Sequence, residues 1–277
     1  METTAGGGEG SAAGVVAPTQ VRGQPEAAAA FDIAGPDGAP TLVFLHGTRV
    51  TRSMWNLQVA GLTDRYRVVT VDLPGHGVLA DMHFRMPAAV AVARSAIEGS
   101  GGRAIVVGQS LGGYVAMELA AAHPDLVAGL VLCNATMEPR TVARRAPRTV
   151  GGYLVGRVGE RYLGRGAPAP AAEPAAGPAS RATNGWLFKG GYGAVVAALR
   201  TKFGPKLAAY PGPALLVNGA DDPLFRRGEG AFLAACQDGR LRVIDGAGHL
   251  VNSDQPDAFN AAIREFAEAV FATPRTQ

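Results

Sequence analysis

The sequence has 277 residues, 47% of them hydrophobic and 18% charged, with a formal net charge of +3. This composition suits one large domain, or one domain carrying an insertion. Dense basic runs are missing, which argues against nucleic-acid binding, and no apolar run is long enough to cross a bilayer. The N-terminal residues lack the pattern of a secretory signal, so we expect a cytoplasmic protein.

Residues 1–25 are rich in Gly, Ala and Thr and are expected to form a flexible tail. Continuous apolar runs then predict strands at 41–45, 66–71, 104–108, 126–133, 214–219 and 241–244. Helical periodicity is found at 87–98, 112–123 and 255–271. Strands that are apolar throughout, with helices between them, are typical of a parallel sheet buried on both faces. The fold class predicted is therefore α/β, with a mostly parallel, doubly wound sheet.

Residues 135–205 interrupt this alternation and contain two Ala/Pro-rich stretches. We interpret them as a helical cap inserted between two parts of one core domain, 26–134 and 206–277. Residues 137–205 hold eleven Arg or Lys against three Glu. This excess indicates either a solvated basic face or a cap that attracts an anionic substrate.

The strongest chemical signal is Gly108-Gln109-Ser110-Leu111-Gly112, a G-x-S-x-G motif between a predicted strand and a predicted helix. Small neighbours let the chain turn tightly, so that the serine hydroxyl projects above the end of the sheet. The helix that begins there adds backbone N–H donors. Ser110 is therefore the candidate nucleophile.

A serine hydroxyl needs a base to accept its proton. His249 follows the last predicted strand, and ligands of open α/β sheets gather at that end of the strands. The other histidines are assigned to turns, a loop and a helix end: His46, His76, His83 and His123. His249 is therefore the candidate general base.

The base needs an acid to orient it. Asp222 follows the predicted strand 214–219 and is the candidate, with Asp221 beside it as the alternative. The order Ser110, Asp222, His249 is the one expected for a hydrolase of this kind. Some relatives carry the acid after the preceding strand, but Asn134 stands there and cannot serve as a carboxylate.

An oxyanion that forms during acyl transfer requires N–H donors already in place. The backbone N–H of Leu111, directly after the nucleophile, is one candidate. The loop His46-Gly47-Thr48-Arg49 follows the strand 41–45 and offers the N–H of Thr48 as the second. Five side chains are considered as pocket walls or, equally, as core: Met54, Trp55, Tyr114, Trp186 and Phe188.

Together these motifs resemble the α/β-hydrolase superfamily, in the branch with carboxylesterases, meta-cleavage-product C–C hydrolases and cofactor-free haloperoxidases. The matching segments occur in the expected order between about residues 31 and 271: Leu45-His46-Gly47, Asp72-Leu73-Pro74-Gly75-His76-Gly77, Gly108-Gln109-Ser110-Leu111-Gly112-Gly113, Gly219-Ala220-Asp221-Asp222-Pro223 and Gly246-Ala247-Gly248-His249. The resemblance implies a core of up to eight strands with a cap over the active site.

The function predicted is hydrolysis of an ester of a small molecule through a Ser-His-Asp triad and an acyl-enzyme, with no metal or organic cofactor. Two alternatives stay open. One is hydrolysis of a carbon–carbon bond in a vinylogous diketone acid, an anion that a basic cap would suit. The other is a ligand-binding protein of the same fold without turnover, against which a complete predicted triad argues.

Overall fold

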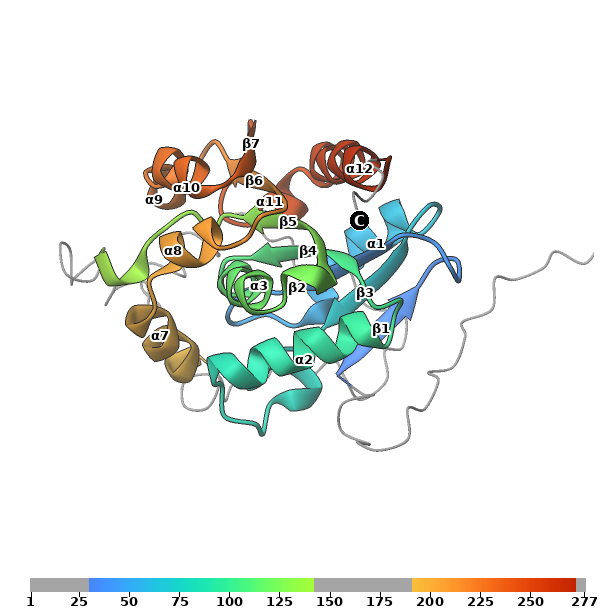
Figure 1. The fold of residues 1–277 in the computed structure, drawn as a ribbon, viewed down its shortest axis with the longest axis horizontal. Coiled ribbons are helices and arrows are strands. Elements are labelled where there is room, and N and C mark those ends of the chain that lie inside the picture. Colours follow the sequence, from blue (N-terminus) through green and yellow to red (C-terminus); the bar gives the residue numbers. More distant parts are fainter. Residues whose placement is uncertain (1–29, 142–190, 273–277) are drawn as a thin grey trace, which may run out of the picture.

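The computed structural model describes residues 30–141 and 191–272, which form a single seven-stranded sheet with helices on both faces (Figure 1). The strand order is β1-β3-β2-β4-β5-β6-β7. The strands are β1 (Phe31–Ala34), β2 (Thr41–Leu45), β3 (Arg67–Val71), β4 (Ala104–Gln109), β5 (Val127–Cys133), β6 (Pro213–Gly219) and β7 (Asp238–Ile244). All neighbouring pairs are parallel except β1 and β3. The predicted fold class is confirmed.

The helices divide into two layers (Figure 1). Their bounds are α1 (Asn56–Leu62), α2 (Met86–Glu98), α3 (Leu111–Ala122), α7 (Gly191–Arg200), α8 (Phe203–Ala208), α9 (Pro223–Arg226), α10 (Glu229–Ala235), α11 (Val251–Asp254) and α12 (Pro256–Ala272), with 3-10 turns η1 (Arg52–Trp55), η2 (Gly77–Leu79) and η3 (Pro124–Leu126). One core cluster packs α2, α3 and α8 on the first face, and the other packs α1, α11 and α12 on the second. Alternate residues of the strands serve the two clusters, as Val43 and Phe44 do.

The parallel register aligns the carboxyl ends of the central strands. Leu45 of β2 pairs with Gly108 of β4, and Gln109 pairs with Cys133 of β5. Further along, Gly219 of β6 pairs with Ile244 of β7. The loops that follow these strands therefore open on one edge of the sheet, where open α/β folds bind their ligands.

All six predicted strands are present, as β2 to β7, with ends that differ by a few residues. β1 was not predicted. Its four residues are mostly half-exposed, and it pairs antiparallel with β3 at the edge of the sheet, so it lacks the continuous apolar run of a central strand. The short helices α1, α9, α10 and α11 were also missed. None of the described helices has the length and apolar character that spanning a bilayer requires.

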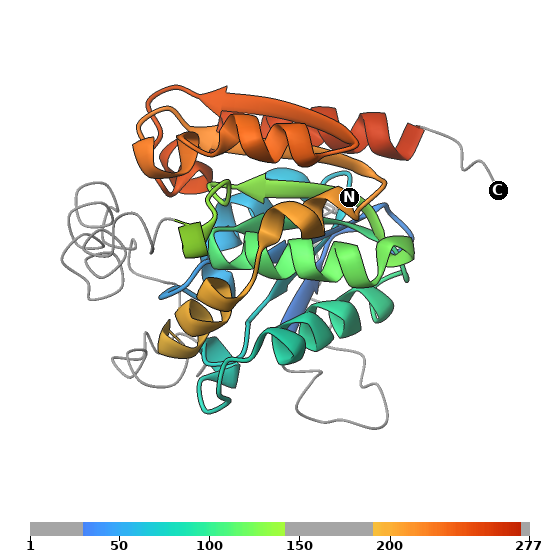
Figure 2. The ribbon, with the colours of Figure 1, turned by 60° about the vertical axis from the view of Figure 1, so that its left-hand side comes forward.

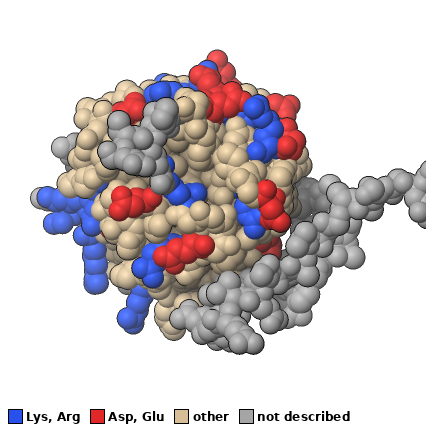
Figure 3. Space-filling view, turned by 45° about the vertical axis from the view of Figure 1, so that its right-hand side comes forward, with Lys and Arg blue, Asp and Glu red and all other residues tan. Residues whose placement is uncertain are grey.

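The expected tail at 1–25 lies outside the described residues, as does most of the expected cap at 135–205. Eight of the eleven basic residues counted there fall within 142–190 and so lie outside as well. On the face drawn in Figure 3, acidic and basic side chains are interspersed among uncharged ones.

The segment that precedes residues 142–190 and the segment that follows them are hydrogen-bonded to each other, and both contact α3. The carboxylate of Glu138 accepts hydrogen bonds from the backbone N–H groups of Phe203 and Gly204, at 2.7 and 2.6 Å. The hydroxyl of Tyr114 donates to the carbonyl of Met137 at 2.9 Å, and its ring stacks on Phe203. Figure 2 shows α8 lying across α3. Tyr114 thus fastens both segments to the helix that follows Ser110.

Candidate active site

Ser110 occupies a strained turn between β4 and α3. Its backbone has φ +50° and ψ −109°, a conformation that costs a residue with a side chain on the order of 1–3 kcal/mol. A Cβ on Gly112 would lie 2.1 Å from the carbonyl oxygen of Leu45, so glycine is required where α3 begins against the end of β2. The first hydrogen bond within the helix runs from Tyr114 N to Ser110 O, which leaves the N–H of Leu111 ahead of it.

Asp222, in the loop after β6, and His249, in the loop after β7, form a buried pair. The Nδ1 atom of His249 lies 2.7 Å from Oδ2 of Asp222, and the two residues are 8% and 2% exposed. Asp222 ends the turn after β6 and also accepts from the backbone N–H of Phe225 at 3.5 Å. The ring of Phe225 packs against the imidazole, with centroids 4.7 Å apart. The histidine is thus held by a carboxylate at its edge and an aromatic ring at its face.

The surroundings keep Asp222 ionised. Burial alone would raise the pKa of this carboxyl, but the hydrogen bond and charge of His249 and the hydrogen bond from Asn134 lower it below its ordinary value. An ionised carboxylate can only accept hydrogen bonds, so the proton of the neutral imidazole lies on Nδ1 and points at Asp222. The other ring nitrogen, Nε2, is then the atom that can accept a proton. The pair is therefore prepared to take a proton at Nε2.

The turn that carries Ser110 contacts the two loops beside it. The side-chain amide of Gln109 donates to the carbonyl of His249 at 3.0 Å. A Cβ on Gly47 would lie only 2.0 Å from Oε1 of the same side chain, so the loop with Thr48 runs directly against it. Gln109 therefore joins the loop of the histidine and the loop after β2 to the serine turn.

A family model for the alpha/beta hydrolase family matches residues 42–262, which include all of these loops and most of the chain. The chain belongs to the alpha/beta hydrolase family. This confirms the resemblance inferred from the motifs, and the seven-stranded sheet is the fold expected of such a hydrolase.

Curated relatives match the chain over part of its length. A segment of 107 residues is 41% identical to a pimeloyl-[acyl-carrier protein] methyl ester esterase of Methylococcus capsulatus, covering 38% of this chain and 39% of that relative. Another of 90 residues is 39% identical to the esterase of the same name from Vibrio cholerae, covering 32% and 34%. The chain thus spans only about a third to two fifths of the length of these relatives.

Solved structures match it over nearly the whole fold. A thermophilic esterase from Thermogutta terrifontis, solved with malate bound, is 28% identical, with a TM-score of 0.62 over 87% of this chain and 93% of the other. An enol-lactonase from Burkholderia xenovorans is 21% identical, with a TM-score of 0.61 over 85% and 95%. The second likeness is one of fold alone.

Three residues other than glycine have positive φ within residues 30–141 and 191–272, and all three lie at this edge of the sheet. They are Arg49, at +71°, Ser110, at +50°, and Asn134, at +44°. They follow β2, β4 and β5, which are neighbours in the sheet. Strained backbone of this kind persists where the surrounding structure imposes it, and it concentrates at functional sites.

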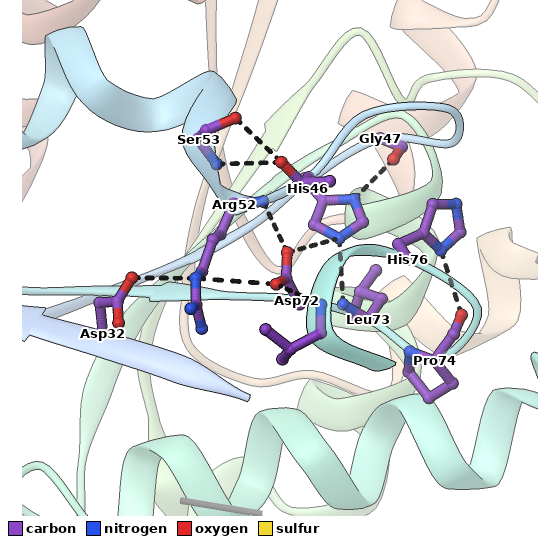
Figure 4. A network of polar contacts seen from close by, with 11 residues as sticks. Asp32, His46, Gly47, Arg52, Ser53, Asp72, Leu73, Pro74 and His76 are labelled. Atoms are coloured by element: carbon purple, nitrogen blue, oxygen red, sulfur yellow. Dashed lines mark hydrogen bonds and ion pairs between the residues drawn. The ribbon is translucent and has the colours of Figure 1, made fainter. Parts of the chain in front are cut away.

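His46 ties the loop after β2 to the loop after β3 (Figure 4). Its Nε2 accepts from the backbone N–H of Leu73 at 3.0 Å, so Nδ1 carries the proton and donates to Gly47 O at 2.7 Å. Burial and the neighbouring ring of His76 lower the pKa of His46 to about 3, although the bond to Gly47 opposes them. His46 is thus a neutral structural residue, which lies in the loop directly before the turn at Thr48 and Arg49.

Asp72 lies at the centre of the same network (Figure 4). It accepts from the backbone N–H groups of Arg52 and Val78, at 2.8 and 3.1 Å. The Arg52 guanidinium lies between Asp72 and Asp32 of β1, with contacts of 3.6 and 2.9 Å. Burial raises the pKa of Asp72, and these donors oppose that shift. The network ties the start of η1, and with it the loop after β2, to β1 and to the loop after β3.

The remaining candidates separate clearly. Asp221 is exposed, whereas the carboxylate of Asp222 contacts the imidazole. Trp55 belongs to the core, where it is fully buried and stacks on Phe259, and Tyr114 is tied to Met137 and Phe203 as described above. Met54 is partly buried and packs against the same core cluster as Trp55. Trp186 and Phe188 lie outside the described residues.

Sequence reasoning did not identify the contacts of Gln109, Phe225 and Asn134. Gln109 occupies the unspecified position of the motif, so no pattern marked it. Phe225 follows Pro223 in a helix too short to show a period. Asn134 did carry a signal, because a polar residue directly after a buried strand lies at the edge where such a fold binds ligands.

Proposed function

We propose that this alpha/beta hydrolase is a serine esterase, with Ser110 as nucleophile, His249 as general base and Asp222 as the orienting acid. The observation that carries the proposal is the buried Asp222–His249 pair, whose loop is hydrogen-bonded through Gln109 to the strained turn of Ser110. A strained serine turn joined to the loop of an oriented imidazole supports this assignment, because a serine hydroxyl is activated by a base that a carboxylate orients.

In this mechanism Nε2 of His249 takes the proton of Ser110 as Oγ attacks the ester carbonyl carbon. The N–H groups of Leu111 and Thr48 stabilise the oxyanion. The imidazolium then gives its proton to the leaving alcohol, and the acyl group stays on Oγ. Water, deprotonated by the same imidazole, then attacks the acyl carbon of the acyl-enzyme. As the bond from this carbon to Oγ breaks, the imidazolium returns its proton to Oγ, which releases the carboxylic acid and regenerates Ser110.

The substrate class follows from chemistry and from the relatives. The names of the curated relatives denote methyl ester hydrolysis, and the structure at 28% identity is that of an esterase with a dicarboxylate bound. Both support an ester of a carboxylic acid, and the basic residues between 137 and 205 favour an acid with a second negative charge. We also propose that residues 135–205 form the cap, inserted between core parts 26–134 and 206–277.

The test is a panel of p-nitrophenyl esters, methyl esters of mono- and dicarboxylic acids and a vinylogous diketone acid, with fluorophosphonate labelling alongside. We expect the wild type to hydrolyse esters and take the label, and Ser110→Ala to do neither. Ser100→Ala is the matched control, since Ser100 is equally buried but bonds to Ala96 and Ile97 carbonyls at the end of α2.

Three results would count against the esterase. Labelling or turnover that survives in Ser110→Ala refutes the assignment of Ser110 as the nucleophile. Selective turnover of the diketone acid assigns carbon–carbon bond hydrolysis instead. A folded wild type that neither labels nor hydrolyses any member of the panel indicates a binding protein whose serine is not activated.

A further inference from the structure

Asn134 places its side-chain amide against the acid of the proposed triad. Its Nδ2 donates to Oδ2 of Asp222 at 2.7 Å, the same oxygen that lies 2.7 Å from Nδ1 of His249. It also lies 3.4 Å from the carbonyl of Gly248, the residue before the histidine. One amide group thus contacts both the carboxylate and the loop of the base.

The backbone holds this side chain in place at a cost. Asn134 has φ +44°, and its own N–H donates to the carbonyl of Val217 in β6 at 3.0 Å. The residue is completely buried. Asparagine tolerates the left-handed region better than most residues, but a residue retained there only for packing would more simply be glycine. The side chain therefore has a use that offsets the strain.

We propose that Asn134 is a positioning residue, which fixes the carboxylate of Asp222 so that one oxygen faces Nδ1 of His249. The inference rests on the proposed esterase function. Within the described residues, Oδ2 receives two donors that approach from different residues, whereas Oδ1 receives the backbone N–H of Phe225 at 3.5 Å. Without the amide, the carboxylate keeps His249 as its single strong partner and gains freedom to rotate.

The amide also moderates the negative charge that the imidazole experiences. A donor on Oδ2 draws charge from the carboxylate, so its loss strengthens proton binding by the pair. Among the described residues on the loops beside the pair, Asp254 accepts from Gly248 N at 2.8 Å, Glu229 is paired with Arg226 at 3.1 Å, and Asp221 is exposed. None of them replaces the amide. The acid limb of the pH–rate profile is therefore expected to move to higher pH when Asn134 loses its amide.

Two variants distinguish the effect of the Asn134 amide from the effect of its strained backbone. Asn134→Gly removes the amide and relieves the strain at positive φ, so the protein is expected to stay folded. Asn134→Asp keeps the shape but sets a second carboxyl against Asp222, and two such groups share one proton. Asn260→Ala is the control, because it removes a buried amide from α12 that donates to Leu57 O at 3.3 Å, far from the pair.

Steady-state kinetics on a p-nitrophenyl ester between pH 5 and 9 provide the readout. For Asn134→Gly we expect kcat to fall about tenfold, with KM unchanged and the acid-limb midpoint raised by about one pH unit, the scale of a lost hydrogen bond to a charged group. Asn134→Asp should move the midpoint less than Asn134→Gly does, because the shared proton supplies a donor to Asp222 in place of the amide, and Asn260→Ala should leave it in place.

A folded Asn134→Gly whose kcat and midpoint equal those of the wild type overturns the inference and leaves the esterase intact. A midpoint that moves equally in Asn260→Ala overturns it too, since the effect would then be one of general loosening. Failure of the wild type to turn over any ester refutes the proposed function instead. In that case the low-field NMR resonance of the His249 Nδ1 proton still tests the contact, and an unchanged resonance in Asn134→Gly rejects it.

Discussion

Replacement of Asp222 by asparagine gives a prediction that depends on its particular neighbours. The Oδ2 position is faced by two donors, Asn134 Nδ2 and His249 Nδ1, each at 2.7 Å. An amide placed there will therefore turn its oxygen toward them, because its NH2 group would meet two donors. The imidazole of Asp222→Asn then keeps its proton on Nδ1, and Nε2 stays the atom that can accept a proton.

The loss of activity then reflects mainly the missing charge. Two unit charges about 4 Å apart interact by about 4 kcal/mol at an effective dielectric constant of 20. At 1.36 kcal/mol per factor of ten, the rate should fall about 10³-fold. An amide that instead imposes the wrong tautomer costs a serine hydrolase about 10⁴-fold. The second mutation Asn134→Gly removes the donor that orients the new amide, so the double variant should approach the larger loss.

The assay is hydrolysis of a p-nitrophenyl ester at pH 8, with active sites counted by fluorophosphonate labelling. If Asp222→Asn alone loses as much as the double variant, the orientation of the amide does not depend on Asn134 and the reasoning is wrong. If Asp222→Asn retains the full rate, Asp222 is not the acid.

Three further outcomes are expected from the described structure. Trp55→Ala should lower the free energy of unfolding by about 3–5 kcal/mol in urea titrations, because a fully buried indole is lost; a change below 1 kcal/mol would contradict its place in the core. Tyr114→Phe should cost about 0.5–1.5 kcal/mol, through its bond to Met137, and a smaller loss would mean that this bond contributes little. Because the pKa of His46 is about 3 in the folded protein, the unfolded chain binds more protons between about pH 6.5 and 3. The free energy of unfolding should therefore fall by about 1.4 kcal/mol for each pH unit as the pH drops through that range. His46→Gln, if folded, should make this dependence on pH less steep.

The sequence was sufficient for the central sheet because each central strand is apolar throughout and is followed by a marked turn. Five of the predicted strands differ at their ends by one residue or not at all, whereas the first residues of β7 are exposed and charged, so only its last four were predicted. The sequence does not predict β1 for a related reason, since a short strand at a sheet edge needs little apolar surface. Whether a segment forms an edge strand depends on its pairing with residues that are distant in the sequence, so local sequence patterns do not predict it.

The candidate site shows the same division. Ser110, Asp222 and His249 stand at strand ends within recognisable motifs, and the structure brings Asp222 and His249 into contact. Asn134 was noted only as a residue that cannot be the acid. Its contact with Asp222 depends on a backbone angle and on the packing of two loops 88 residues apart, which no spacing rule encodes.

The three strained residues at the ends of β2, β4 and β5 also bear on how this chain would evolve. Glycine at position 49, 110 or 134 would fold with less strain at the backbone, so a population selected only for stability should accumulate it there. A population selected for turnover should keep serine at 110 and asparagine at 134. Deep mutational libraries sorted separately by folding and by ester hydrolysis would therefore diverge most at this edge of the sheet.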